Sequence, residues 1–296
     1  MNRTKTGTIS YSLVHDIGIL VKFKLSLMVV FSSALSYIIL AKDHFNWTHF
    51  VLLCAGGLSV TFAANALNQC LERDYDKLMV RTAMRPVADG RMTVSMSVLI
   101  SGLLCMVGVI FLALISPEAA TLGMLSFVIY AFVYTPLKRY STMAIPVGAV
   151  PGALPALIAG VVACQGFTWE AILLFGIQYL WQFPHFWAIA WLGHEDYTRA
   201  GYRLINDVDG RPDPKYGLYA AVYAILSLVF LAGFVYMDQM NFGIALLLML
   251  AILSYSAFGW NLYRRNDARS ARLLMFSSII YLPLVLLLFL INNFMS

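Results

Sequence analysis

Long runs of apolar residues, separated by short polar segments, dominate the sequence between residues 25 and 292. Most of these runs approach or exceed the ~20 residues that a helix needs to cross the hydrocarbon core of a bilayer. Lipid offers no partners for backbone N–H and C=O groups, so spanning segments of this kind are predicted to be α-helices. We expect nine of them, over residues 25–41, 47–66, 94–115, 117–135, 144–163, 169–191, 216–236, 242–260 and 273–292.

The composition supports an all-α membrane protein, a bundle of about nine transmembrane helices. The chain of 296 residues is 60% hydrophobic and only 12% charged, about half the charge fraction of a soluble domain. Its four cysteines are scattered in or beside apolar runs and form no CxxC pair, so we expect neither disulfides nor a zinc site. We interpret residues 1–296 as a single domain, in which residues 1–20 form a polar cytoplasmic segment and not a signal peptide.

The basic residues are distributed unequally between the two sides of such a bundle. If nine runs span the membrane, all lysines and arginines except Lys42 lie on the side of the N-terminus. The positive-inside rule then places the N-terminus in the cytoplasm and the C-terminus in the periplasm of a multi-pass protein in the plasma (inner) membrane. This bias accounts for the net charge of +5, and we expect no nucleic-acid partner.

A polar series follows the second apolar run in the segment NQCLERDYD. Asn68, Glu72 and Asp76 stand four residues apart, which would place them on one helical face with a drift of roughly 40° per step. Carboxylates at a membrane boundary are costly to desolvate and therefore indicate function. Oxygen ligands of this kind suit Mg²⁺ together with the phosphate oxygens of a substrate. The pattern favours metal-assisted chemistry on a phosphorylated, lipidic substrate.

Further candidate residues lie in the same connection and in the one after the sixth run. Arg81 and Arg85 are four residues apart, and guanidinium groups bind phosphate oxygens well. The sixth-to-seventh connection begins GHEDYTRAGYR and brings a second acidic cluster, in which Arg199 follows Asp196 by one turn. This cluster could complete a metal site between two halves of the bundle, or it could be an ordinary solvated loop.

His185 lies inside the sixth run, in the aromatic stretch QYLWQFPHFWAIAW. Two interpretations remain open from the residues alone. His185 could be a neutral structural histidine that is hydrogen-bonded to a neighbouring helix. Alternatively, it could contact a flat aromatic substrate or the metal of that substrate, because neutral imidazole is a common iron ligand.

Several of these segments together resemble the UbiA-type intramembrane prenyltransferases, and within them the enzymes that farnesylate haem. The matching segments are NQCLERDYDKLMVRTAMRP, VYTPLKR, VGAVPGALPALIAG and QFPHFWAIAWLGHEDYTRAGYRL. The family carries an Asn-x₃-Asp-x₃-Asp face after the second helix and a second acidic motif after the sixth. This chain departs from it at Glu72, which replaces an aspartate, and in its Glu195-Asp196-Tyr197 sequence, which replaces spaced aspartates.

The resemblance implies that farnesyl diphosphate, haem B and water give haem O and diphosphate, for the biogenesis of haem–copper oxidases. It also implies a bound Mg²⁺, a cytoplasmic-side active site in contact with membrane lipid, and a downstream haem O-modifying enzyme as a partner. The implied metal ligands are Asn68, Glu72, Asp76 and Asp196, with Arg81 joining them as a catalytic residue. The implied diphosphate-binding residues are Arg81, Arg85, Lys138 and Arg199. The implied acceptor-binding residues are His185, Trp181 and Tyr197.

Two other functions remain open. The same chemistry could act on another aromatic acceptor, such as a quinone precursor. The chain could also be a haem or lipid transporter without catalysis, although transport would favour acids spread through the bilayer, and nearly all acids here lie at one predicted face.

Overall fold

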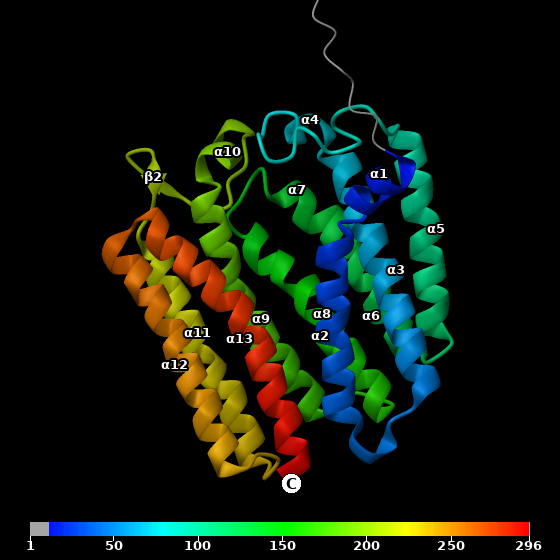
Figure 1. Cartoon of the computed structure of the whole chain (residues 1–296), viewed down its shortest axis with the longest axis vertical. Helices are drawn as coiled ribbons and strands as arrows, with labels where there is room; N and C mark the ends of the chain where they lie inside the picture. The colour runs from blue at the N-terminus through cyan, green and yellow to red at the C-terminus, as the bar shows by residue number, and fades with distance from the viewer. Residues whose placement is uncertain (1–11, 296) are drawn as a thin grey trace, which may run out of the picture.

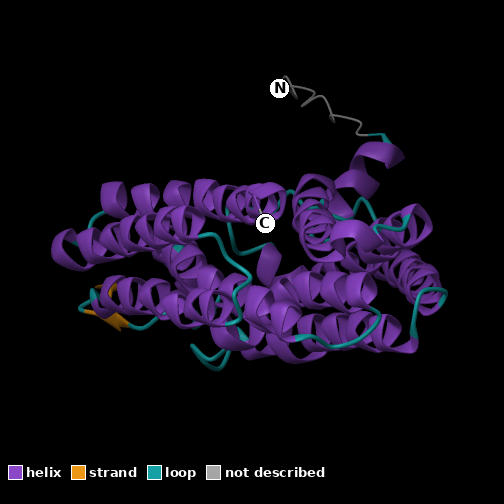
Figure 2. Ribbon diagram, turned by 90° about the horizontal axis from the view of Figure 1, so that it is seen from below, coloured by secondary structure: helices purple, strands orange, loops and turns teal. Residues whose placement is uncertain are grey.

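The computed structural model describes residues 12–295, which form a bundle of long helices (Figure 1). The helices are α1 (Leu13–Leu20), α2 (Phe23–Ala41), α3 (Trp47–Leu71), α4 (Arg73–Asp76), α5 (Val94–Ala113), α6 (Pro117–Val128), α7 (Thr135–Leu137), α8 (Ala144–Cys164), α9 (Trp169–Leu192), α10 (His194–Arg199), α11 (Lys215–Tyr236), α12 (Phe242–Arg265) and α13 (Ala268–Met295). A 3₁₀ turn, η1 (Lys42–His44), follows α2, and a π-helix, η2 (Ile129–Tyr134), joins α6 to α7. Strands β1 (Asp207–Val208) and β2 (Arg211–Pro212) form a short antiparallel hairpin at one edge (Figure 2).

Eight helical segments within residues 12–295 are long and apolar enough to cross a membrane, which confirms the prediction of an all-α membrane protein. The remaining predicted run, residues 169–191, forms α9, which has the length of a span. The hydropathy of α9 is reduced by polar residues such as Gln178, Gln182 and His185. Both glutamine side chains are buried, so α9 directs them into the bundle and not toward lipid. A total of nine crossings remains a prediction.

Short polar residues fix where several of the long helices begin. The side chains of Asn46, Thr93, Ser116 and Thr168 each accept a hydrogen bond from a backbone N–H in the first turn of α3, α5, α6 and α9. Such N-caps satisfy amides that have no partner inside the helix, which matters most where water is scarce. The positions at which these helices begin are therefore determined by the local sequence.

The core has two large apolar clusters, one centred on α2, α3, α5, α6 and α8 and the other on α9, α11, α12 and α13. Helix α8 connects them, because it packs against both α2 and α9. Pro155 inside α8 has no N–H for the carbonyl of Pro151, and Ser126 donates its hydroxyl to that carbonyl at 3.3 Å. The serine hydroxyl therefore satisfies a carbonyl that the proline leaves without a partner inside the helix.

The segment before the first span was predicted only as polar chain, and the structure corrects this for residues 13–20. These residues form α1, whose Leu20 is fully buried with Ala66 of α3; residues 1–11 lie outside the described part. Figure 1 shows α1, α4, α10 and the hairpin at one end of the bundle and the C-terminus at the other. The two acidic segments therefore lie at the same end of the molecule.

Candidate active site

The polar series forms the floor of the candidate site, where α3 passes into α4. Asn68, Glu72 and Asp76 are 1%, 4% and 0% exposed. The prediction of one continuous helical face needs a correction, because α3 ends at Leu71 and Glu72 is a non-helical junction with φ −97° and ψ 2°. The N–H groups of Glu72 and Asp76 still donate to the carbonyls four residues earlier, at 2.9 and 2.8 Å, so the three side chains stay together despite the break.

Each member of the series contacts a basic side chain. Arg85 Nη1 donates to both carboxylate oxygens of Asp76, at 2.9 and 2.8 Å. Lys138 Nζ lies 2.5 Å from Glu72 Oε1. Asp74, two residues before Asp76, is in contrast largely exposed and pairs with its neighbours on the surface. The site is therefore a buried network of alternating charges, and Asp76 does not lie exposed at a polar boundary.

A third cation, Lys22, completes the network. Its ammonium donates to Asn68 Oδ1 at 3.3 Å. Asn68 Nδ2 in turn donates to Thr135 Oγ1 at 3.0 Å, and the Thr135 hydroxyl donates to the Tyr130 carbonyl at 2.8 Å. The π-helix η2 places Thr135 at this position, and π-helical turns are frequent at functional sites. The amide is thus oriented with its oxygen toward the cations.

The electrostatics of the cluster follow from burial and from these pairs. Burial raises the pKa of the Glu72 carboxyl, but Lys138, Lys22 and Arg85 outweigh it and hold the pKa below its usual value. Burial lowers the pKa of Lys22 to about 7, and the neighbouring cations Arg85 and Lys138 lower it as well. The same cations that stabilise the carboxylate destabilise one another, so an added anion would stabilise the whole cluster.

The donor set fits Mg²⁺ by its chemistry, since an amide oxygen and two carboxylates are hard oxygen ligands. In the described residues, however, no three His, Cys, Asp or Glu side chains converge as a ready metal site. Lys138 and Arg85 hold the two carboxylates, and Asp196 pairs with Arg199 at 3.2 Å instead of joining the first motif. Asn68, Glu72 and Asp76 remain the candidate ligands, and Asp196 does not join them in this structure.

The two acidic connections nevertheless meet. Arg81 Nη2 donates to Tyr197 Oη at 2.9 Å, and the rings of Tyr75 and Tyr202 lie 5.8 Å apart. Burial raises the pKa of the Tyr202 phenol, and the Glu72 carboxylate raises it further, so this hydroxyl is a neutral proton donor beside the cluster. Tyr202 and Thr135 were missed as site residues, although Thr135 lies within the family-like segment VYTPLKR.

His185 lies deeper in the bundle, between α9 and α13. Its Nδ1 is 2.7 Å from Ser278 Oγ, and its ring stacks on Trp181 with centroids 5.2 Å apart. The Ser278 hydroxyl is already committed to the Met275 carbonyl, so it can only accept from His185. This pairing favours the tautomer with the proton on Nδ1, in which Nε2 keeps its lone pair.

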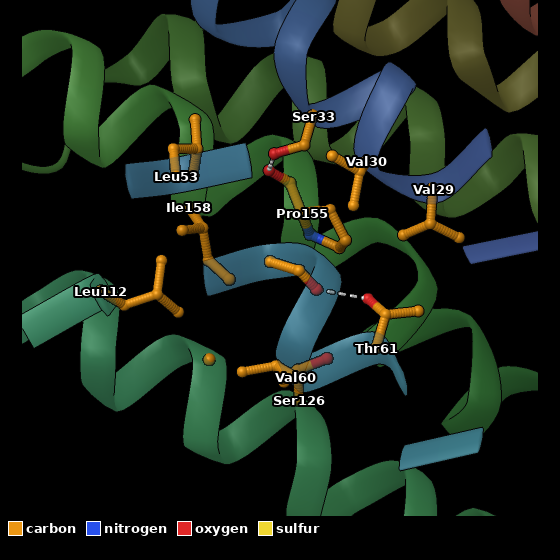
Figure 3. Close-up of a pocket in the computed structure, with 12 residues that line it drawn as sticks. Val29, Val30, Ser33, Leu53, Val60, Thr61, Leu112, Ser126, Pro155 and Ile158 are labelled. Atoms are coloured by element: carbon orange, nitrogen blue, oxygen red, sulfur yellow. Dashed lines mark hydrogen bonds between the residues drawn. The ribbon is translucent and has the colours of Figure 1, made fainter. Parts of the chain in front are cut away.

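A small apolar hollow of about 30 Å³ lies further along the bundle (Figure 3). Its walls come from α2, α3, α5, α6 and α8, and include Gly57 and Thr61. Both residues lie on the side of α3 that carries Asn68, and Gly57 is about 16 Å from it along the axis. The hollow contains none of the charged side chains of the site, so it offers space for an apolar group only.

Comparisons with known proteins identify the family and the fold of this chain. The model of the UbiA prenyltransferase family matches residues 28–280. A protoheme IX farnesyltransferase from Cytophaga hutchinsonii is 40% identical over 278 residues, covering 93% of this chain and 96% of that protein. A solved structure of digeranylgeranylglyceryl phosphate synthase aligns with a TM-score of 0.78 at 14% identity, covering 96% of this chain and 99% of the other.

A second solved structure, a UbiA homologue from Archaeoglobus fulgidus bound to DMAPP and Mg²⁺, has a TM-score of 0.71 at 16% identity. It covers 95% of this chain and 98% of its own. The structural neighbours establish the fold, while the family model and the curated relative extend over most of the sequence. The chain is a multi-pass membrane protein that belongs to the UbiA prenyltransferase family.

Proposed function

We propose that this chain transfers the farnesyl group of farnesyl diphosphate to a vinyl group of haem B, with addition of water, to give haem O and diphosphate. The observation that carries the proposal is the buried cluster of Asn68, Glu72 and Asp76, faced by Lys22, Lys138 and Arg85. Oxygen ligands beside buried cations suit a diphosphate and its metal. The choice of haem as the acceptor rests on the curated relative named protoheme IX farnesyltransferase.

Mg²⁺ would be held by Asn68, Glu72 and Asp76, and when bound it would make the diphosphate a better leaving group. Arg81, Arg85 and Lys138 stabilise the negative charge that develops as the carbon–oxygen bond to diphosphate breaks. Arg199 and Asp196 pair with each other in the second acidic segment, which meets the first through the contact of Arg81 with Tyr197. The neutral phenol of Tyr202 lies beside Glu72 and can donate a hydrogen bond within the site.

The acceptor step needs controlled access of water. The haem vinyl carbon forms a bond to the allylic carbon of the farnesyl cation, and water then adds to the porphyrin-stabilised cation and releases a proton. His185, whose ring stacks on Trp181, would contact the porphyrin or its iron through Nε2. Tyr197, whose hydroxyl accepts a hydrogen bond from Arg81, would also contact the acceptor. The farnesyl chain runs along α3 toward the hollow that contains Gly57.

The reaction takes place on the cytoplasmic side of the plasma membrane, in a single domain that covers residues 1–296. Nineteen of the 20 basic residues belong to the end of the bundle where this cluster lies, if nine segments cross the membrane. Haem O would leave into the lipid or to a haem O-modifying enzyme that serves haem–copper oxidases.

Parallel incubations with two acceptors test the function. Purified protein with farnesyl diphosphate and Mg²⁺ is given either haem B or 4-hydroxybenzoate, and the products are separated and identified by mass spectrometry. We expect a farnesylated haem and no farnesylated hydroxybenzoate. The reverse result would assign the protein to quinone synthesis. No product from either acceptor, together with haem binding, would favour a carrier.

A further inference from the structure

Lys22 stands outside both acidic motifs, yet its side chain enters the candidate site. Its ammonium contacts Asn68 Oδ1 at 3.3 Å, across 46 residues of sequence. The only other lysine in this corner, Lys24, is exposed. A lysine next to a membrane span usually serves orientation, and an outward-facing ammonium would serve that purpose equally well. The inward direction of Lys22 therefore needs another explanation.

Hydrogen bonds from α3 fix the backbone around Lys22 and hold its side chain toward the site. Lys22 has φ +48° and ψ 55°, a left-handed conformation that is unfavourable for a residue with a side chain. Gln69 Nε2 donates to the carbonyls of Ile19 and Leu20 at 2.8 and 3.1 Å, and ties the corner to α3 one residue after Asn68. The strained turn is thus held by the same helix that carries the polar series.

A second set of contacts holds the other side of the corner. Asn65 Nδ2 donates to Ser26 Oγ at 3.0 Å, and the Ser26 hydroxyl donates to the Val21 carbonyl at 2.8 Å. Ser26 and Asn65 are both buried. Lys22 therefore projects from a rigid support on both sides, unlike a surface lysine whose side chain samples many rotamers.

The charges in the cluster do not balance without a ligand. When Lys22 is protonated, the three cations Lys22, Lys138 and Arg85 face the two carboxylates of Glu72 and Asp76, and the cluster has one more positive than negative group. An uncompensated buried charge is costly. A diphosphate ester bound with one Mg²⁺ carries excess negative charge, and so would neutralise the cluster. Of the three cations, Lys22 contacts a neutral amide and not a carboxylate, so it carries the excess charge.

We propose that Lys22 is a diphosphate-binding residue of this site, held by the α1–α2 corner to transfer its ammonium from the Asn68 amide oxygen to a diphosphate oxygen of the prenyl substrate. This inference rests on the proposed function for the identity of the substrate. It adds a ligand from the N-terminal corner to the arginines and lysine of the two connections. Moving the ammonium also frees the Asn68 oxygen for other ligands.

The test compares Lys22→Met with Lys24→Met, a matched control two residues away in an exposed position. The probe is inorganic diphosphate with Mg²⁺, titrated against each purified protein by calorimetry, with haem B titrated separately. Loss of a charge-assisted contact is expected to weaken diphosphate binding about 10- to 100-fold in Lys22→Met. Lys24→Met should bind as the wild type does, and Lys22→Arg should recover most of the affinity.

The melting temperature of the ligand-free proteins distinguishes a binding role from a structural one. Because Lys22→Met removes the excess charge, it should melt at the wild-type temperature or above it, while its stabilisation by diphosphate falls. A lower melting temperature with equal losses for haem and diphosphate would overturn the proposal, as would unchanged diphosphate binding. If Lys22→Met does not insert into the membrane, Lys22→Gln keeps a partner for Asn68 without the charge. The same binding and melting results for Lys22→Gln would then support or overturn the proposal.

The role of Lys22 and the proposed function can fail separately, and different results would reveal each failure. A wild-type protein that makes haem O while Lys22→Met binds diphosphate normally would remove Lys22 alone from the site. A wild-type protein that binds diphosphate through Lys22 but makes no farnesylated haem would refute the acceptor and leave the binding residue in place.

Discussion

At the scale of single residues, burial separates side chains that the sequence makes look alike. Asp74 and Asp76 are two residues apart in one acidic segment, but Asp76 is 0% exposed and bound by Arg85, whereas Asp74 is on the surface. The four-residue spacing keeps Asp76 on the side of Asn68 and Glu72, because the i→i−4 hydrogen bonds persist through the break at Glu72; the role of Asp76 stays a prediction. The spacing did not predict that each of the two carboxylates, Glu72 and Asp76, forms an ion pair with a separate basic side chain.

Asp76→Asn should therefore reduce turnover about 100-fold or more. The amide keeps the shape of the side chain but removes the charge, which weakens a metal ligand and leaves Arg85 without a counter-ion. Steady-state formation of farnesylated haem measures the effect. Asp74→Asn serves as the control and should stay within about twofold of the wild type, since surface ion pairs contribute little.

Because Asp76 is buried, the substitution should also lower the melting temperature, as expected when one member of a buried ion pair is removed. Activity is therefore compared below the melting temperature of the variant. If Asp76→Asn retained wild-type turnover there, or if Asp74→Asn lost as much, the chemistry would have to be placed elsewhere.

His185 gives a second prediction at this scale. If Nε2 contacts the haem, His185→Ala should weaken haem binding about tenfold, a loss of ~1.4 kcal/mol, and leave farnesyl diphosphate affinity unchanged. Ser278→Ala removes the Nδ1 partner but keeps Nε2, so it should have the smaller effect. Spectral titration of haem and calorimetry of farnesyl diphosphate measure the two affinities. Equal losses for both ligands would make His185 a structural residue.

At the scale of elements, the apolar runs predicted most long helices, but not the elements that shape the site. The α1–α2 corner was missed because its hold on α3 depends on contacts far apart in sequence, such as Gln69 with Ile19. The π-helix η2 was missed because an apolar run of aromatic and aliphatic residues is equally compatible with an α-helix. The corner supplies Lys22, and η2 leads into Thr135 at the start of α7; both of these side chains contact Asn68.

The hollow beside α3 leads to a prediction about prenyl length. A Cβ on Gly57 would meet only Val30, at 4.0 Å, so Gly57→Leu can fill the hollow without strain at the backbone. If the farnesyl chain lies there, this variant should lose more kcat/KM with farnesyl diphosphate than with the shorter geranyl diphosphate. The comparison is made with haem B as the acceptor for both.

The matched control is Gly102→Leu in α5, where a Cβ has nothing within 4 Å. It should not change the ratio of the two kcat/KM values. An unchanged ratio in Gly57→Leu as well would place the farnesyl chain along a different surface of the bundle.

At the scale of the whole molecule, both acidic connections and α1 gather at one end of the bundle, and the C-terminus lies at the other (Figure 1). The same-side placement was predicted from the alternation of basic residues, which depends only on how many times the chain crosses. The contact of Arg81 with Tyr197 was not predictable, because it depends on how α3 and α9 are positioned relative to each other. The pairing of Asp196 with Arg199 likewise depends on local geometry.

A reporter experiment tests the orientation. An activity reporter fused after residue 296 should behave as periplasmic, and one inserted within residues 77–92 should behave as cytoplasmic, because 19 of the 20 basic residues favour that side. A cytoplasmic C-terminus would mean that α9, the most polar of the long helices, does not complete a crossing.

The central claim, that this chain farnesylates haem with addition of water, is tested most directly by the mass of its product. Purified protein is incubated with haem B, farnesyl diphosphate and Mg²⁺ in water enriched in oxygen-18, and the haem is analysed by high-resolution mass spectrometry. We predict a haem that has gained one farnesyl group and one hydroxyl group carrying the heavy oxygen. Recovery of unmodified haem B, or of a farnesylated haem without the labelled oxygen, would contradict the claim.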